Sequence, residues 1–449
     1  MQPSALHSST AAALLGLALT LSAASGIPAP ALPRPLTLEA ALGYAAEHNP
    51  GLLRTREVVR EQEGVLVEVR AGLLPTLGTT GSYSRVDDQR LESPLYSDRA
   101  WSVDVTVKQL LYSGGGTQAK VRSQREQLEA ARLTFTAALN DTLLSVHRQF
   151  YAVLLDRELI GVQEEAQQVL EAELAKARHR REAGSGSDFD ILRAEVAVAN
   201  SRPALIRARN TYRNAQDQLR ATLGSTATDA SQPTDLNVQG ALAMPRHEVA
   251  LIDAITAARA HRPELLQQER LAQAAEQGIV GARSGYQPTV SAVAGYEWAK
   301  PSLLTTPQSH LDGWTAGLQA SWNIFDGRAT SGRVAQARAR ANQVQFATEE
   351  RQLAVEIEVR QAHSSLAEAD ELLTSSEKVV EQARESLRLS QSRFQAGIAT
   401  QLDVLTAQSS LTQARSNLAQ AQHDYAVASA ALNRATGLAP GVNQHTLGS

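Results

Sequence analysis

The stretch WTAGLQASWNIFDGR, residues Trp314–Arg328, decides the fold of this chain. Its first half alternates apolar side chains, among them Trp314 and Leu318, with small or polar ones. A period of two predicts a β-strand that has one apolar face and one polar face. The Asp326-Gly327 pair that follows predicts a sharp exit from the strand.

The same pattern occurs earlier, in WSVDVTVKQLLYSG at Trp101–Gly114. A single offset (314 − 101 = 213) brings Trp101 onto Trp314. The same offset relates Pro75 to Pro288, Tyr83 to Tyr296, Asp190 to Asp403, Tyr212 to Tyr425, and Gly224 to Gly437. A repeat of this length indicates two copies of one large unit rather than a short-repeat solenoid. We therefore predict a tandem duplication of residues 36–224 and 249–437, joined by a linker at 225–248.

Each copy is predicted to contain a helix, a β-hairpin, a long helix, a short tip and a final helix. The predicted hairpins are 76–112 and 289–324, and the predicted tips are 183–187 and 396–400. The long helices, at about 118–182 and 329–395, would each extend roughly 100 Å, a length that favours coiled-coil-like packing. The two shorter helices of a copy together match its long helix, so we expect them to stack end to end beside it.

The two ends of the chain are predicted to lie outside this duplicated fold. Residues 1–27 are predicted to be a signal peptide, because an apolar run at 11–24 precedes small residues. The Pro-rich residues 28–35 are predicted to be extended, and residues 438–449 to be a disordered tail. Beyond the leader no apolar run is long enough to cross a bilayer, so no transmembrane helix is expected. The chain has no Cys, and we therefore expect no lipidated N-terminal cysteine.

The four predicted strands per chain raise the question of what covers their apolar faces. One answer is a soluble sheet packed on a core, within a periplasmic coiled-coil scaffold or adaptor. The other is a membrane barrel, for which roughly eight strands is the usual minimum, so the chain would have to oligomerise. Three copies would supply twelve strands. An interfacial aromatic girdle would then comprise Trp101, Trp298, Trp314, Trp322, Tyr83 and Tyr296. The seam between barrel and helices would comprise Gly114, Gly115, Asp326 and Gly327.

The two tips share a pattern that has two interpretations. The shared residues are Arg180, Gly184, Ser187 and Asp190 in the first copy, and Arg393, Gly397, Thr400 and Asp403 in the second. In the first interpretation the Gly residues end one helix in the left-handed conformation, and Ser or Thr with Asp forms a capping box for the next helix. In the second, the tips also form a docking rim and a pore constriction. Before the first tip lies a basic cluster, Lys176, Arg178, His179, Arg180 and Arg181, which is a solvated face or a partner contact.

Motifs for catalysis are absent from the sequence. It contains no G-x-S-x-G elbow and no Walker loop, and its ten His form no H-x-x-x-H pair. The net charge of −4 does not favour a nucleic-acid partner. We therefore expect no enzyme activity, no cofactor and no metal site.

Together these features resemble the TolC-like outer-membrane efflux protein family. The resemblance rests on LLYSGG at 110–115, NIFDGR at 323–328, the two tip patterns, and HNP and HRP near the repeat starts at 48–50 and 261–263. It implies a mainly α fold with transmembrane β-strands. Three chains would form a 12-stranded β-barrel in the outer membrane and a 12-helix α-barrel across the periplasm.

The resemblance also implies a function and partners. The homotrimer would be the passive outer-membrane exit duct of a tripartite efflux or type I secretion system, for small molecules or proteins. An inner-membrane pump would drive export, and a periplasmic adaptor would bind the tips. Members of the family can carry an acidic ring inside the closed periplasmic end. The matching gate candidates are Asp403 and Thr406, with Asp190 and Arg193 at the equivalent positions of the first copy.

Overall fold

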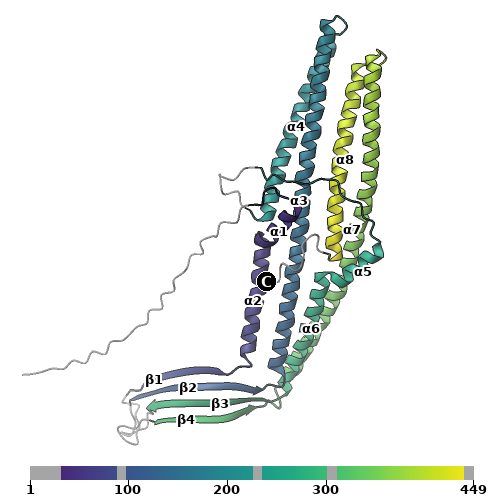
Figure 1. Ribbon diagram of the computed structural model, residues 1–449. Helices are drawn as coiled ribbons and strands as arrows, with labels where there is room; N and C mark the ends of the chain where they lie inside the picture. Colours follow the sequence, from purple (N-terminus) through teal and green to yellow (C-terminus); the bar gives the residue numbers. More distant parts are fainter. Residues whose placement is uncertain (1–31, 88–97, 226–234, 301–310, 439–449) are drawn as a thin grey trace, which may run out of the picture. The chain divides into compact units, whose positions relative to one another are not determined.

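The computed structural model describes residues 32–87, 98–225, 235–300 and 311–438, and Leu32–Ser449 form one unit by their contacts. The predicted signal peptide lies outside the described residues, as do most of the predicted tail and parts of the linker and of both hairpin loops. The described ranges contain eight α-helices and one four-stranded sheet, arranged as in Figure 1. The fold is therefore mainly helical, as the sequence predicts.

The helices and strands follow the predicted order of the two copies. The first copy contains α1 Leu38–His48, α2 Pro50–Ala71, β1 Thr76–Arg85, β2 Arg99–Tyr112, α3 Gly116–Glu182 and α4 Asp188–Leu223. The second contains α5 Leu251–His261, α6 Pro263–Arg283, β3 Thr289–Lys300, β4 Leu311–Ser321, α7 Ala329–Gln395 and α8 Gln401–Thr436, with a short 3-10 turn at Ser284–Tyr286. Both long helices, α3 and α7, have 67 residues.

The second hairpin is shorter than the predicted 289–324. Strand β4 ends at Ser321, whose partner is Thr289, the first residue of β3. Pro288 precedes Thr289 and has no N–H to donate to a ladder, so the residues after Ser321 have no strand to pair with. They lead into α7 instead.

The four strands pair antiparallel in the order β1-β2-β3-β4, so β1 and β4 are the two edges. In the half of the helical layer next to the sheet, the helices lie in the order α2, α3, α6, α7 (Figure 1). In the half farther from the sheet, which we call the far half, α4 takes the place of α2 and α8 takes the place of α6. The two shorter helices of each copy thus stack end to end beside a long one, as their lengths predict.

The end-to-end stacking is held by equivalent hydrogen bonds in the two copies. Asn49 Nδ2 donates to the carbonyl of Thr222 at 2.7 Å, and Arg262 Nη1 donates to the carbonyl of Ala435 at 2.8 Å. Both donors immediately precede a Pro that begins the next helix. Each side chain therefore satisfies a carbonyl that the end of a helix leaves without an intrahelical partner. We call these two places the helix junctions.

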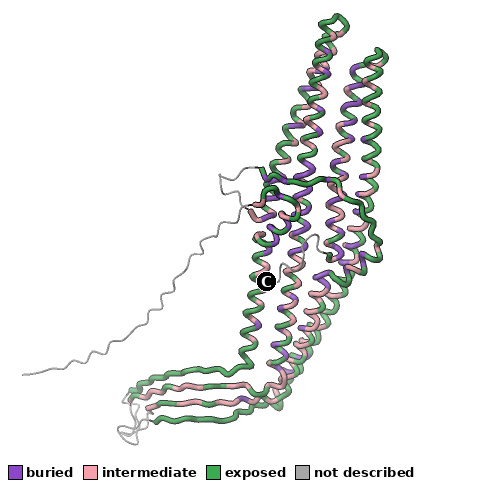
Figure 2. Tube along the Cα trace, in the orientation of Figure 1, coloured by how far each residue is buried: buried purple, intermediate pink, exposed green. Residues whose placement is uncertain are grey.

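The main core lies around the junctions rather than beside the sheet. It gathers α1, the middle of α3, the end of α4 and the segment 236–242, where Leu36 and Val238 form a parallel bridge. A second cluster packs α5 against α7 and α8. Figure 2 shows buried residues along the helices, while the strands are exposed or intermediate, with Ser291 alone buried among the described strand residues. The alternative of a soluble sheet packed on a core is therefore not supported.

None of the helices in the described ranges is both long enough and apolar enough to cross a membrane.

Among the buried ionisable groups of α3, His147 and Asp156 have shifted pKa values that bear on stability in mild acid. Burial lowers the pKa of His147 to about 4, and neither ring nitrogen has a hydrogen-bond partner in the described structure. Burial also raises the pKa of Asp156 to about 6, partly offset by His423. Between pH values of about 4 and 6 the two shifts affect the free energy of unfolding in opposite directions. At His147 the unfolded chain binds more protons, so stability rises with pH. At Asp156 the folded chain binds more protons, so stability falls with pH.

The junctions predict a specific sensitivity to methyl groups. Gly437 ends α8 with φ of +77°, and an added Cβ would lie 2.7 Å from the carbonyl carbon of His261. Gly437→Ala is expected to destabilise the protein by more than the roughly 1–2 kcal/mol that a left-handed conformation alone costs. Thermal unfolding in detergent measures the loss. Gly64→Ala, in α2 with open space around it, is the matched control and should be neutral or stabilising.

His147 predicts a change in the acid stability profile. The folded pKa lies below the unfolded value near 6.5, so the contribution of neutral His147 is complete above that value and is lost as pH falls toward about 4. His147→Leu should therefore gain stability relative to the wild type by up to roughly 3 kcal/mol between those pH values. Melting temperatures across this range provide the measurement. Parallel profiles for His147→Leu and wild type would contradict the assignment.

Candidate functional site

The strand register divides the sheet into two chemically different faces. Residues directly opposite one another share a face, so Val107, Ala294 and Ala316 lie together on one side. The rows beyond them on that side are Thr79, Val105, Tyr296 and Trp314, and then Gly81, Val103, Trp298 and Asp312. The opposite side carries Gly78, Thr106, Gly295 and Thr315, and then Thr80, Asp104, Glu297 and Gly313. We call these the apolar face and the polar face.

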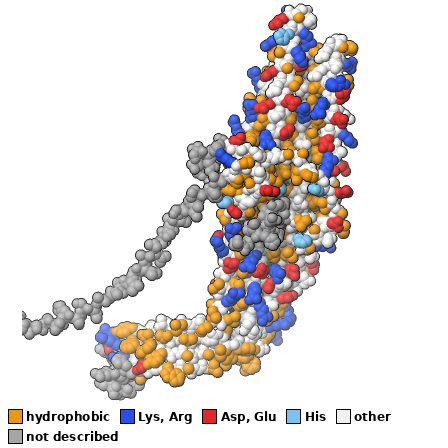
Figure 3. All heavy atoms as spheres, in the orientation of Figure 1, with side chains coloured by type: hydrophobic (Ala, Val, Ile, Leu, Met, Phe, Trp, Pro, Cys, Tyr) orange, Lys and Arg blue, Asp and Glu red, His pale blue; other side chains and the backbone are white. Residues whose placement is uncertain are grey.

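The apolar face is open to its surroundings in the chain. Trp314 is 76% exposed and Leu318 is 74% exposed. Figure 3 shows hydrophobic side chains gathered over the sheet, with charged side chains spread over the helices. Monomeric soluble proteins rarely expose so continuous an apolar surface, and such surfaces mark contacts with a membrane or with other chains.

The six predicted girdle residues do not lie at one level. The five at the loop end of the sheet are Tyr83, Trp101, Tyr296, Trp298 and Trp314, all on the apolar face. Trp322 lies at the opposite end, where its Nε1 donates to the carbonyl of Tyr286 at 3.2 Å. Between the two levels the apolar face carries mainly small and aliphatic side chains, and the polar Gln109 beside Ala292 and Leu318 donates to the carbonyl of Leu73. This arrangement suits two aromatic bands on either side of an apolar band.

The predicted seam is built on similar turns in both copies. Gly114, Gly115 and Gly327 have positive φ, and so does Arg328, at +73°. Arg328 stands where the first copy has Gly115, and the sequence analysis did not identify it. A side chain then caps each long helix. Ser113 Oγ accepts from the Thr117 amide at 3.2 Å, and Asp326 Oδ2 accepts from the Thr330 amide at 2.8 Å.

A hollow of about 1040 Å³ lies where the helices meet the sheet. It is lined by one side of α2, α3, α6 and α7 and by Thr289 and Ser321 at the foot of the polar face. A hollow shared by four neighbouring helices requires their layer to curve toward that side. A second hollow, of about 1250 Å³, is lined by α5, α6 and α7. On α6, Leu271, Ala274 and Gly278 line the first hollow, whereas Glu269, Ala272 and Glu276 line the second. At 3.6 residues per turn these two sets lie on opposite sides of the helix, so α5, which lines the second hollow, is on the side away from the first.

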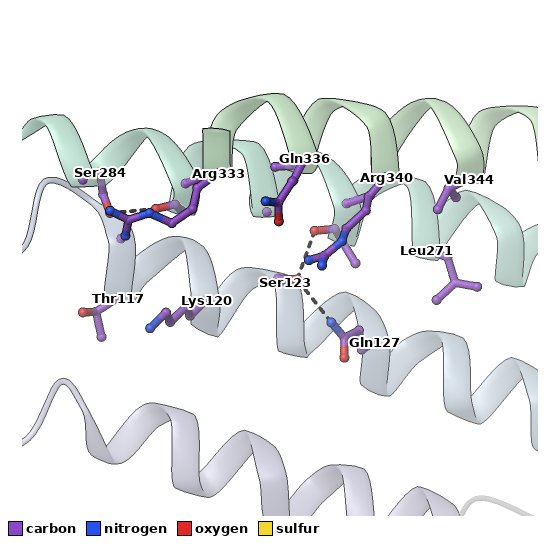
Figure 4. Close-up of a pocket in the computed structure, with 18 of the residues that line it drawn as sticks. Thr117, Lys120, Ser123, Gln127, Leu271, Ser284, Arg333, Gln336, Arg340 and Val344 are labelled. Carbon is purple, nitrogen blue, oxygen red and sulfur yellow. Dashed lines mark hydrogen bonds between the residues drawn. The ribbon is translucent and has the colours of Figure 1, made fainter. Parts of the chain in front are cut away.

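The sequence analysis did not single out the charged residues of the first hollow. Lys120, Arg333 and Arg340 line it together with the seam residue Asp326. In Figure 4 Arg333 and Arg340 extend from α7 in the direction of the α3 side chains. In the sequence each of these cations looks like an ordinary charge on the solvated face of a helix. Their grouping is recognised only because all three line the same hollow in the structure.

The second tip has the predicted capping box. Asp403 Oδ2 accepts from the Thr400 amide at 2.7 Å and from its hydroxyl at 2.8 Å, while the Asp403 amide donates to Thr400 Oγ1. Hydrogen bonds from the Thr400 backbone and side chain lower the pKa of Asp403, and Arg393 adds to the shift. Gly397 ends α7 with positive φ. Thr406 lies three residues on and is exposed, as Asp403 is.

The first tip differs, and the capping box predicted there is wrong. Ser187 Oγ accepts from the Phe189 amide at 3.0 Å instead of from Asp190. The preceding Asp188 forms two hydrogen bonds with Arg181, at 2.6 and 3.2 Å. The guanidinium of Arg193 lies 4.6 Å from the ring centroid of Phe189, an exposed residue in the first turn of α4. Gly184 has the predicted positive φ.

The predicted basic cluster is largely paired within its own helical hairpin. Lys176 contacts Glu173, Arg178 contacts Glu195, and His179 lies 3.5 Å from Glu182. Arg180 is the exception. Its guanidinium lies 4.3 Å from the ring centroid of Phe394, which lies at the end of α7 just before the second tip. The structure thus brings the ends of α3 and α7 that lead into the two tips into contact through a cation–π pair.

A metal site is not seen in the described part of the chain, where no group of three or more His, Asp or Glu side chains could hold an ion.

A network of charges at the second junction was missed by the sequence analysis. Arg262 is 1% exposed and contacts Glu264 and Glu358, while Arg434 contacts Glu264 and Asp141. This network links α6, α7, α8 and α3.

Comparison with known proteins gives matches over most of the chain. The outer membrane efflux protein family matches twice, over residues 41–225 and 254–438. The two matches are displaced by the offset found within the sequence (254 − 41 = 213). The chain is 26% identical over 405 residues to the outer membrane efflux protein BepC of Brucella suis, covering 89% of this chain and 85% of the relative.

Another relative and a solved structure extend the comparison. The chain is 24% identical over 360 residues to TtgC of Pseudomonas putida, described as a probable efflux pump outer membrane protein, covering 78% and 72% of the two chains. The outer membrane protein VceC of Vibrio cholerae has the same fold, with a TM-score of 0.73, 20% identity, and coverage of 89% and 96%.

Proposed function

The chain belongs to the outer membrane efflux protein family, and from this premise we propose that it is the outer-membrane channel of a tripartite efflux or type I secretion system. The channel is a passive exit duct for small molecules or proteins and catalyses no reaction. The observation that carries the proposal is the four-stranded sheet with one apolar and one polar face, joined on its polar side to a curved layer of helices. The soluble scaffold or adaptor is disfavoured because the sheet has no core.

A homotrimer would complete this structure. Strands β1 and β4 are the edges of the sheet, and both are exposed along their whole length in this chain. Pairing β4 of one chain with β1 of the next would give three chains a closed 12-stranded barrel in the outer membrane. The outer helices of the layer also expose apolar side chains, among them Ile206 on α4 and Leu353 on α7. Such side chains on both outer helices suit burial between neighbouring chains.

The curvature of the helical layer indicates which side would face the passage. In a closed ring of three chains the concave side, with the first hollow, lies inside, and α5 lies outside. The polar face of the sheet adjoins the same hollow through Thr289 and Ser321. The apolar face, with its two aromatic bands, then contacts lipid. The seam at Gly114, Gly115, Asp326 and Gly327 is where barrel would become helical tube.

The tips are proposed to close the periplasmic end and to bind a periplasmic adaptor that connects to an inner-membrane pump. Docking residues would be Arg180, Gly184, Ser187, Arg393, Gly397 and Thr400. Opening would separate the tips, and the contact between Arg180 and Phe394 is one that would break. An exposed cation–π pair contributes about 0.5–1 kcal/mol, small enough to be exchanged for contacts with an adaptor.

The direct test is purification from membranes and recording in planar lipid bilayers. We expect the protein to require detergent for extraction, to form a trimer in native mass spectrometry, and to conduct ions after insertion. Recovery of the protein from the soluble periplasm, or a monomer that forms no conducting unit, would contradict the proposal.

Asp403 has two proposed roles that one pair of variants separates, because the capping box needs an acceptor oxygen and a gate needs a charge. Asp403→Asn keeps an acceptor for the Thr400 amide and removes the charge, whereas Asp403→Ala removes both. If Asp403 lines the constriction, both variants should weaken block by divalent cations in bilayer recordings. Only Asp403→Ala should lose stability, by about 1 kcal/mol.

Asp190→Asn is the matched variant in the first copy, where the carboxylate takes no part in a capping box. It should change block without changing stability. Unaltered block in Asp403→Asn, together with lower stability in Asp403→Ala, would mean that Asp403 only caps its helix.

A further inference from the structure

The first hollow carries an unbalanced positive charge. Its ionisable lining residues are Lys120, Arg333, Arg340 and Asp326. Asp326 is already engaged, since its Oδ2 accepts from Thr330 and lies 3.4 Å from Arg333 Nη2. Within the described residues no carboxylate lies within salt-bridge distance of Lys120 or Arg340. Each chain therefore contributes two cations without a bonded counter-charge.

The duplication explains why Lys120 has no acidic neighbour. Lys120 and Arg333 occupy equivalent positions of the two copies (333 − 120 = 213), and both line the same hollow. The residue equivalent to Asp326 in the first copy is Ser113, which caps α3 with a neutral hydroxyl. The first copy thus retains the cation and the cap but has no carboxylate.

The helix ends around the hollow do not alter this balance. Helices α3 and α7 begin there, which places positive ends of helix dipoles near the hollow. Helices α2 and α6 end at the same level, which places negative ends there. The two pairs offset one another to first order. The side chains therefore determine the sign of the local potential.

We infer that Lys120 and Arg340 form a ring of positive charge in the passage, on the helical side of the seam, which we call the cationic neck. This ring favours anionic solutes such as carboxylates, sulfonates and phosphates. The inference rests on the proposed function, because a trimer with the hollows inside brings six such cations around one axis. Like charges lining a channel wall raise the local concentration of ions of the opposite sign. Exported molecules that carry negative charge would pass this level most readily.

A test must read the neck alone, because other levels of the passage carry other charges. Asp104 and Glu297 lie opposite one another on the polar face of the sheet, and Asp403 and Asp190 lie at the tips. Since the chain has no Cys, a single thiol can serve as a local reporter. Gln336→Cys places it on the lining of the hollow, on α7 between Arg333 and Arg340.

The experiment compares modification rates of channels carrying Gln336→Cys in lipid bilayers by two thiol reagents, an anionic sulfonatoethyl and a cationic trimethylammonioethyl methanethiosulfonate. The ratio of anionic to cationic rate should fall about threefold near 0.1 M salt when Lys120→Gln and Arg340→Gln are added, and by more at lower salt. The matched control adds Arg122→Gln and Arg338→Gln, which remove the same charge from α3 and α7 outside the hollow lining. The control should leave the ratio unchanged.

Each outcome decides the inference separately from the proposed function. An unchanged ratio in a channel that conducts would overturn the cationic neck and leave the duct intact, as would a thiol that neither reagent reaches. Equal falls in the neutralised channel and in its control would also overturn it. If the neutralised variant does not assemble, the reporter channel alone suffices, because its rate ratio should approach the ratio for a free thiol as salt rises toward about 1 M. A ratio independent of salt would contradict the inference.

Discussion

Each 67-residue helix has a packing partner along its whole length only because two shorter helices meet end to end beside it. The packing of the whole helical layer therefore depends on the junction between those two shorter helices. The carboxyl end of one helix faces the amino end of another, so opposite ends of their dipoles adjoin. A Pro begins the second helix without an unsatisfied N–H, and Asn49 or Arg262 donates to a carbonyl of the first. A glycine at the end of the first helix, Gly224 or Gly437, leaves room for the approach.

The two copies solve this common problem with different chemistry. Asn49 is neutral and needs one carbonyl, whereas Arg262 is buried and needs Glu264 and Glu358 as well. Burying charges costs desolvation that their attraction only partly returns, so the charged junction is not a stronger version of the neutral one. Its additional effect is connectivity. Arg434 joins the same acids to Asp141 on α3, and thereby ties the second copy to the first at the level of the core.

The extent to which the sequence predicts this structure follows from the range of each interaction. The long helices, their glycine ends and the two-faced strands depend on local pattern, and residues such as Gly184, Gly397 and Trp314 were identified from it. At the first tip Ser187 is the N-cap, as predicted, but the capping box is wrong, because the Ser187 hydroxyl accepts from the Phe189 amide rather than from Asp190. Pattern alone does not rank such alternative contacts. Arg262, Lys120 and Arg340 could not be assigned at all. Their partners, or the lack of them, depend on helices that lie far away along the chain.

The distribution of these contacts suggests where the channel would move. The sheet is held by ladders of backbone hydrogen bonds, and the junctions by the buried residues of the core around them. Toward the tips two side-chain pairs join the copies, the partly exposed Arg415 with Glu165 and then Arg180 over Phe394. Exposed pairs of this kind contribute about 0–1 kcal/mol each. A partner that binds the tips therefore has to offset little free energy to separate them, whereas separating the helices at the second junction would expose the buried charges of Arg262 and Glu264. Movement confined to the far half of the helices would leave the sheet and the adjoining cationic neck unchanged.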